Sequence, residues 1–96
     1  MKLTIEPCKL KNKKYTAIFS HQNKITKVHF GASGYSDFIL SGGDKKKREA
    51  YIKRHQVNEN WTDPMTPATL SRYILWGEYP DLNKNINLFK KLFNLT

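Results

Sequence analysis

Histidine is the residue type in this chain with the most versatile chemistry, because imidazole titrates near neutral pH and binds metal ions. The chain has three, His21, His29 and His55, and a single cysteine, Cys8. No two histidines have the four-residue spacing of a helical zinc site, and neither an HExxH motif nor a Cys/His cluster is present. One cysteine excludes an internal disulfide, and we interpret it as a small apolar residue. We therefore expect structural histidines, no metal and no cofactor.

A metal-dependent nuclease would need two or more carboxylates that converge with a histidine or lysine. His29 and His55 could meet in the fold near Asp37 or Glu59, which leaves one enzyme hypothesis open. The supply of acids is small, because two of the eight acidic residues, Asp44 and Asp81, have the sequence positions of helix N-caps. The residues favour a protein without catalytic activity, and a small nuclease or other enzyme that uses His29 and His55 is the third alternative.

Positive charge is the strongest compositional feature of the chain. Seventeen Lys and Arg residues against eight Asp and Glu residues give a formal net charge of +9. Such an excess favours binding to polyanions, and nucleic acid is the first candidate. Only three residues are arginines, so base reading by bidentate hydrogen bonds should be limited and sequence specificity low.

The predicted helix over 44–56 concentrates this charge. At 100° per residue, Tyr51 and His55 fall on one face, whereas Lys53 and Arg54 fall on another. A basic ridge of this kind suits phosphate contacts, although it is equally compatible with a solvated helix face. The predicted nucleic-acid-binding residues are Lys45, Lys46, Lys47, Lys53 and Arg54, with a second patch of Lys84, Lys90 and Lys91.

Three strands should precede this helix. Apolar residues alternate with polar ones at Leu3 and Ile5, again from Tyr15 to Phe19, and again at Val28 and Phe30. The links between these runs are short, so the strands should form an antiparallel meander. We expect Asn23, in the second link, to adopt a left-handed backbone.

Three helices should complete the fold. After the helix over 44–56, Thr66-Pro67 predicts the start of a second helix that ends near Trp76. A third, amphipathic helix follows Asp81. The only charge in the second helix is Arg72, which must reach solvent or pair with an acid such as Asp63 or Asp37. Trp61 should fill the junction between helices.

These elements predict one α+β domain over residues 1–96, with a three-stranded antiparallel meander followed by three helices packed on one face. The sheet region is 1–31, a glycine-rich connector spans 32–43, and the helical region is 44–96. The connector lacks the GxxxxGK[ST] pattern of a phosphate-binding loop, so no nucleotide or other small-molecule ligand is expected. Neither a membrane-spanning run nor a signal peptide is evident, which predicts an intracellular protein without a membrane partner.

Four motifs resemble a family of small basic domains of unknown function from nucleocytoplasmic large DNA viruses, which infect algae and amoebae. They are VHFGASGYSDF (28–38), YIKRH (51–55), NENWTDPMT (58–66) and LSRYILW (70–76). The resemblance covers about half of the chain and is less distinct over the first 27 residues. Members often have glycine where this chain has Pro67-Ala68, and proline remains compatible with a helix start. The resemblance implies a viral origin and brings no catalytic residues.

Together, charge and resemblance favour a small viral protein that binds DNA or RNA without sequence specificity through the phosphate backbone. It would act in the host cytoplasm or nucleus and is a candidate for packaging in virions. The alternative is a protein-interaction or virion structural module that binds a viral protein partner. Its surface would consist of exposed aromatic side chains, for which the candidates are Tyr35, Trp61 and Trp76.

Overall fold

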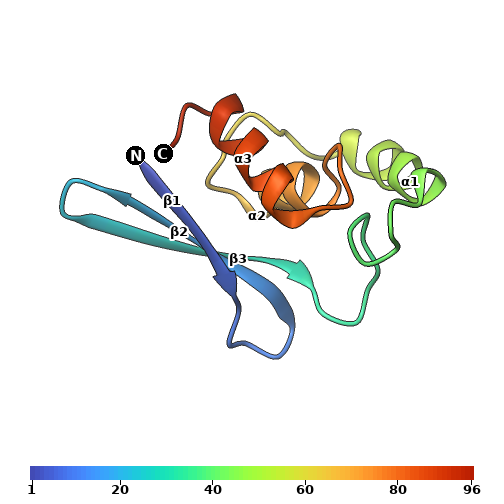
Figure 1. Ribbon diagram of the computed structural model, residues 1–96, viewed down its shortest axis with the longest axis horizontal. Helices are drawn as coiled ribbons and strands as arrows, with labels where there is room; N and C mark the ends of the chain where they lie inside the picture. Colours follow the sequence, from blue (N-terminus) through green and yellow to red (C-terminus); the bar gives the residue numbers. More distant parts are fainter.

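The computed structural model describes all residues from 1 to 96. Its N-terminal part is an antiparallel meander with the strand order β1-β2-β3, as Figure 1 shows. The strands are β1 (Lys2–Pro7), β2 (Lys13–His21) and β3 (Lys24–Ala32). Three helices follow, so the predicted α+β class and the predicted order of elements are confirmed.

The register of the sheet follows the alternation in the sequence. Leu3 lies opposite Phe19, and Ala17 lies opposite Val28, so the apolar residues of all three strands share one face. At the β2–β3 turn, His21 pairs with Lys24 and leaves two residues in the loop. The left-handed residue there is Gln22, with φ of 55°, so the prediction of Asn23 was wrong. Two-residue hairpins also include turns in which only the first loop residue has positive φ.

The helical part contains α1 (Lys45–Gln56), a continuous helix formed by α2 (Pro67–Leu70) and η1 (Ser71–Leu75), and α3 (Leu82–Leu92). The continuous helix of α2 and η1 is called the central helix below. All three predicted N-caps are confirmed, because the side chains of Asp44, Thr66 and Asp81 accept hydrogen bonds from backbone amides of the first helical turn. Ordinary capping chemistry therefore decides where each of the three helices starts.

The helix η1 has π geometry, with one more residue in its turn than an α-helix. The amide of Trp76 donates to the carbonyl of Ser71, five residues earlier, at 3.0 Å. Such π turns are rare and are often found at functional sites.

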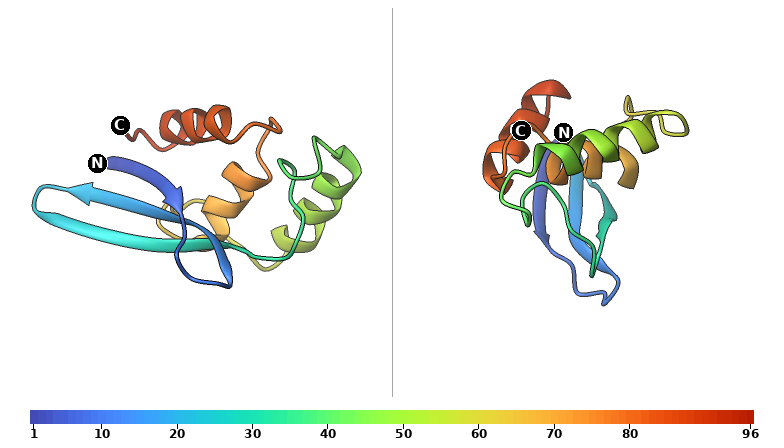
Figure 2. Two further views of the ribbon diagram at one scale, coloured as in Figure 1. Left: turned by 60° about the horizontal axis from the view of Figure 1, so that its bottom comes forward. Right: turned by 90° about the vertical axis from the view of Figure 1, so that its right-hand side faces the viewer.

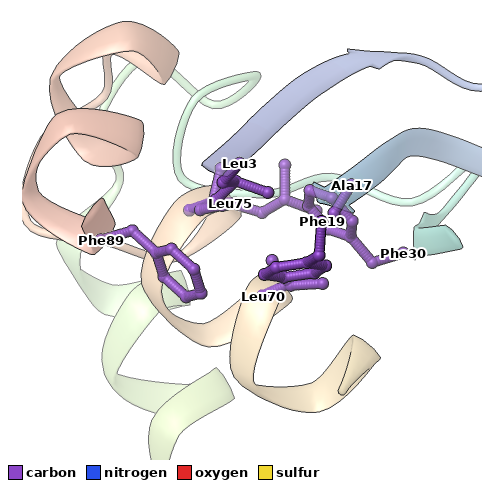
Figure 3. Packing of buried hydrophobic residues seen from close by; sticks show 8 residues of the cluster. Leu3, Ala17, Phe19, Phe30, Leu70, Leu75 and Phe89 are labelled. Atoms are coloured by element: carbon purple, nitrogen blue, oxygen red, sulfur yellow. The ribbon is translucent and has the colours of Figure 1, made fainter. Parts of the chain in front are cut away.

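The hydrophobic core lies between the sheet and the helices. The helices α2 and η1 contact β3, and η1 also contacts α3, so the central helix lies between the sheet and α3, as Figure 2 shows. Figure 3 shows the packing of the core side chains that these elements contribute. The cluster consists of Leu3, Ala17, Phe19, Phe30, Leu70, Ile74, Leu75 and Phe89.

Asn85 fixes the angle between the central helix and α3. It is fully buried, and its Nδ2 donates to the carbonyls of Ile74 (2.9 Å) and Tyr79 (2.7 Å). Its Oδ1 accepts from the amide of Tyr79 at 3.1 Å, so the buried amide is fully used. Gly77 passes so close that an added Cβ would lie 2.7 Å from Asn85 Cγ. The chain reversal between the two helices is therefore held by polar bonds inside the core.

Candidate functional site

A cleft of about 680 Å³ lies beside α1. Its walls come from the start of β2, the end of β3 with the loop that follows it, α1 and the central helix. The hairpin end of the sheet lies at the opposite end of the molecule from α1 (Figure 1). The cleft therefore forms at the junction between the sheet region and the helical region.

The balance of charge in the cleft is positive. Four cationic side chains line it, those of Lys13, Lys14, Lys47 and Arg54. Two acids also line it, and both are paired. Asp37 Oδ2 lies 2.6 Å from Lys14 Nζ, and Glu59 Oε2 lies 2.5 Å from His55 Nδ1. These pairs leave Lys13, Lys47 and Arg54 as cations without an acidic partner, which suits an anionic ligand.

The Lys14–Asp37 pair anchors one wall of the cleft. The two side chains are only 13% and 3% exposed, so this is an ion pair within the protein. Lys14 Nζ also donates to the carbonyl of Tyr35 at 2.6 Å, and Asp37 Oδ1 accepts from the amide of Leu40 at 2.8 Å. Because buried charges need such partners, removal of either charge would release the loop that carries Tyr35.

Tyr35 projects from this anchored loop into solvent. It is 72% exposed, more than any other tyrosine of the chain, and it lines the cleft together with Lys47 and Arg54. An aromatic ring that is held at its backbone and free at its side chain offers a face for stacking. The structure thus supplies an exposed aromatic residue beside the basic side chains of α1.

A stack of three rings forms part of the lining of the cleft. The rings of Tyr51 and His55 have centroids 4.0 Å apart, and those of Tyr51 and Trp76 have centroids 4.6 Å apart. Burial raises the pKa of Tyr51 to about 12, and the negative charge of Glu59 adds to this effect. Tyr51 is therefore a neutral, packed residue, and it attaches α1 to the central helix.

Comparison with known families identifies the chain. The family of unknown function DUF5754 matches residues 3–55, which is more than half of the 96 residues. The chain belongs to this family. Neither the curated proteins nor the solved structures contain a match to it. The DUF5754 match covers the sheet, the Tyr35 loop and α1, which supply most of the residues that line the cleft.

The match and the resemblance noted from the sequence agree on unknown function and overlap over residues 28–55. The DUF5754 match includes the first strands, where the resemblance was less distinct, and it ends at His55. The central helix and α3 therefore lie beyond the matched segment. Within this DUF5754 protein, they complete the core and provide the remaining wall of the cleft.

The predicted basic residues of α1 are all exposed, but they do not all lie in one place. Lys47 and Arg54 line the cleft, whereas Lys45, Lys46 and Lys53 lie outside its lining. The predicted second patch is on α3, where Lys84 and Lys91 are exposed and Lys90 is half-buried, and none of these lines the cleft. The structure therefore divides the predicted basic surface into a cleft, the adjoining ridge on α1, and a separate patch on α3.

Two of the three arginines have structural roles. Arg48 Nε donates to the carbonyls of Trp76 (3.2 Å) and Gly77 (2.8 Å), and Arg72 Nη1 donates to Trp76 at 3.0 Å. Arg72 is half-buried and forms no ion pair with Asp63 or Asp37. Its side chain packs over the rings of Trp61 and Tyr73, and its Nε is buried without a partner. Burial lowers the pKa of Arg72, and repulsion by Arg48 lowers it further.

The histidines have separate environments. His29 lies on the side of β3 that faces away from the core, and its Nδ1 is 2.8 Å from Thr16 Oγ1 and 3.5 Å from Cys8 Sγ. His55 lies on α1, where it bonds Glu59. No group of three or more His, Cys, Asp and Glu side chains could hold a metal ion. The two histidines that the enzyme hypothesis requires therefore do not share a site.

The candidate interaction aromatics also differ from one another. Trp61 Nε1 donates to Glu59 Oε1 at 2.8 Å, and its ring packs against Arg72, in agreement with a position between helices. Trp76 is half-buried and stacked on Tyr51. Both indoles are occupied by contacts within the protein, and Tyr35 alone of the three is mostly exposed. No helix is both long and apolar enough to span a membrane.

Sequence reasoning missed Lys13 and Lys14 as members of the site. They belong to a short run of lysines that predicts a charged turn, and they are far in sequence from α1. Only the fold brings Lys13 to the same cleft as Lys47 and Arg54. A signal in the sequence was Gly31, because glycine allows another side chain to pack closely against the backbone. The residue has φ of 81°, and an added Cβ there would lie 2.7 Å from Leu75 Cδ1.

Proposed function

We propose that this protein binds nucleic acid without sequence specificity, and that the cleft beside α1 is the principal binding surface. The observation that carries the proposal is the presence of three cations without acidic partners, Lys13, Lys47 and Arg54, in one cleft whose acids are already paired. Phosphate groups would complete the charge balance, and each contact would release condensed counterions.

Low sequence specificity follows from the arginines. Bidentate reading of guanine requires a free guanidinium, and Arg48 and Arg72 are occupied by carbonyl groups and aromatic rings. Arg54 is the only arginine that is exposed. The exposed lysines are point charges that suit phosphates of any sequence. Backbone binding with weak base preference is the mode that these groups support.

The test is a fluorescence-anisotropy titration of labelled DNA and RNA oligonucleotides at several salt concentrations. The affinity should fall steeply with salt, and the double variant Lys47→Glu/Arg54→Glu should weaken binding at least about tenfold and flatten the salt dependence. Binding that is absent at low salt, or that does not respond to salt, would refute the proposal.

Two matched variants separate local charge from total charge. Lys46→Glu/Lys53→Glu changes the ridge of α1 outside the cleft, and Lys24→Glu/Lys27→Glu changes exposed lysines of the distant hairpin. Each pair lowers the formal charge from +9 to +5, as the cleft pair does. The hairpin pair should have the smallest effect and the ridge pair an intermediate one. Equal losses in all three would show that only net charge matters, against a defined site.

The α3 patch is a second, weaker part of the same proposal. Lys84 and Lys91 are exposed, and Lys84 Nζ lies over the ring of Tyr79 at 5.4 Å. A Lys84→Glu/Lys91→Glu variant measured in the same titration should have a smaller effect than the cleft pair. A larger effect would move the main site to α3.

A viral origin and packaging with the genome belong to this proposal as well. They are supported by the resemblance of residues 28–76 to proteins of large DNA viruses and by the positive charge of the chain. Mass spectrometry of purified virions and of infected-cell fractions should find the protein with the genome in the virus that encodes it. Recovery only as a complex with another viral protein, without nucleic acid, would favour the protein-interaction alternative.

A further inference from the structure

We propose that the preferred ligand is a single strand, with one base stacked on the ring of Tyr35 while its flanking phosphates lie against the cations of the cleft. The inference rests on the proposed function and makes it more specific. Duplex and single strand both present phosphates, but only an unpaired base presents a free aromatic face. The position of Tyr35 therefore decides between them.

The loop that carries Tyr35 contributes to two hollows. One is the cleft beside α1, and the second has a volume of about 690 Å³. Tyr35 lines both hollows, and so does Lys13. An extended chain that runs from one hollow to the other would pass the tyrosine ring. Such a path suits the flexible backbone of a single strand better than a stiff duplex.

The loop is ordered in advance of binding. Lys14 holds the carbonyl of Tyr35 and the carboxylate of Asp37, and the amide of Phe38 donates to the carbonyl of Leu75 at 3.1 Å. The backbone is thus tied to β2 at Tyr35 and to the central helix at Phe38, three residues after the exposed ring. Because the loop does not have to be ordered on binding, little of the stacking free energy is lost.

Exposure of Tyr35 is otherwise unexplained by the fold. It forms none of the aromatic pairs or cation–π contacts that engage Tyr15, Tyr51, Tyr73 and Tyr79. The neighbouring second hollow also contains Leu40, which is 68% exposed. A base is a flat apolar group that would cover such a surface, whereas its attached phosphates need the nearby lysines.

The decisive comparison uses three labelled probes of equal length, about 12 nucleotides, which suits a domain of this size. They are oligothymidylate, an abasic strand with the same phosphates and no bases, and a duplex. The wild-type protein should bind oligothymidylate at least about tenfold more tightly than the abasic strand, and more tightly than the duplex. Equal affinity for oligothymidylate and the abasic strand would overturn the inference.

Substitution of Tyr35 provides the matched test. Tyr35→Ala should weaken binding of oligothymidylate roughly tenfold and leave binding of the abasic strand unchanged, whereas Tyr35→Phe, which keeps the ring, should retain the affinity. Because the side chain is exposed, the fold should survive, and circular dichroism with thermal unfolding checks this. Equal binding of oligothymidylate by wild type and Tyr35→Ala would refute the role of the ring.

The two proposals fail in different ways. If no probe binds even at low salt, both the proposed function and this inference are wrong. If all three probes bind alike and binding depends on Lys47 and Arg54, the proposed function stands and the stacking inference is wrong. Preference for the duplex would likewise leave nucleic-acid binding in place and exclude a single strand as the favoured ligand.

Discussion

Two regions of the molecule are held together by different forces. The sheet, the central helix and α3 share one apolar cluster, to which each of them contributes buried side chains. The helix α1 contributes none. It is attached through the stacked ring of Tyr51 and through hydrogen bonds from Arg48 to carbonyls at the end of the central helix.

The difference bears directly on the candidate site. Apolar burial fixes the main body, which consists of the sheet, the central helix and α3. The wall of the cleft formed by α1 depends instead on a few aromatic and polar contacts. Regions with few buried apolar contacts open locally at lower free energy than the whole domain unfolds. The positions of Lys47 and Arg54 should therefore be adjustable without loss of the fold, which is useful for a surface that meets ligands of varied sequence.

The largest expected effect is in the body. Phe19→Ala removes a fully buried ring and should lower the free energy of unfolding by about 3–5 kcal/mol, through lost burial and a residual cavity. Urea denaturation followed by circular dichroism measures this loss. Ile25→Ala, at a residue 66% exposed on β3, serves as the control and should change little. A loss below about 1 kcal/mol for Phe19→Ala would contradict the division between body and α1.

Gly31→Ala should have the next largest effect, because this residue joins the body to the cleft. The backbone has φ of 81°, and the new Cβ would lie 2.7 Å from Leu75 Cδ1. Strain and crowding should cost about 1–3 kcal/mol in the same measurement. Gly34→Ala is the matched control, since it has a similar φ of 86° and open space around it. Equal losses would show that backbone strain alone is responsible.

Arg48→Leu should loosen α1 and spare the body. The variant loses the hydrogen bonds to the carbonyls of Trp76 and Gly77 but keeps an apolar side chain against Phe38. Amide hydrogen exchange should show local opening of α1 made easier by about 1 kcal/mol, with β2 unchanged. A uniform rise in exchange across both regions would mean that α1 and the body unfold as one unit.

A further effect should be absent at neutral pH and appear only at alkaline pH. Burial raises the pKa of Tyr51 from its ordinary value of 10.0 to about 12, so between these values the folded state retains a proton that the unfolded state has lost. Stability must therefore fall as pH rises from 10 to 12. Tyr51→Phe removes this part of the decline and should be nearly neutral at pH 7. If the stability–pH curves of the wild type and of Tyr51→Phe run parallel between pH 10 and 12, this prediction is wrong.

The sequence predicted the body better than the site, for a physical reason. Alternation of apolar residues and the three capping side chains are local properties, and local chemistry decides where strands pair and helices begin. The cleft combines Lys13, Tyr35 and Arg54, whose proximity depends on how distant elements pack. The contacts of Arg72 could not be predicted for the same reason, since its ring contacts come from Trp61 and Tyr73 and its acceptor is a helix-terminal carbonyl.

The extra residue in η1 has a consequence for chain length. A π turn needs about one more residue than an α turn to complete nearly the same rotation, so deletion of one residue within 71–75 would restore regular α geometry and leave Trp76 on nearly the same side of the helix. Its indole would still face Tyr51, and α1 would keep its main support. Homologous chains one residue shorter in this segment should then present their first helix in the same orientation.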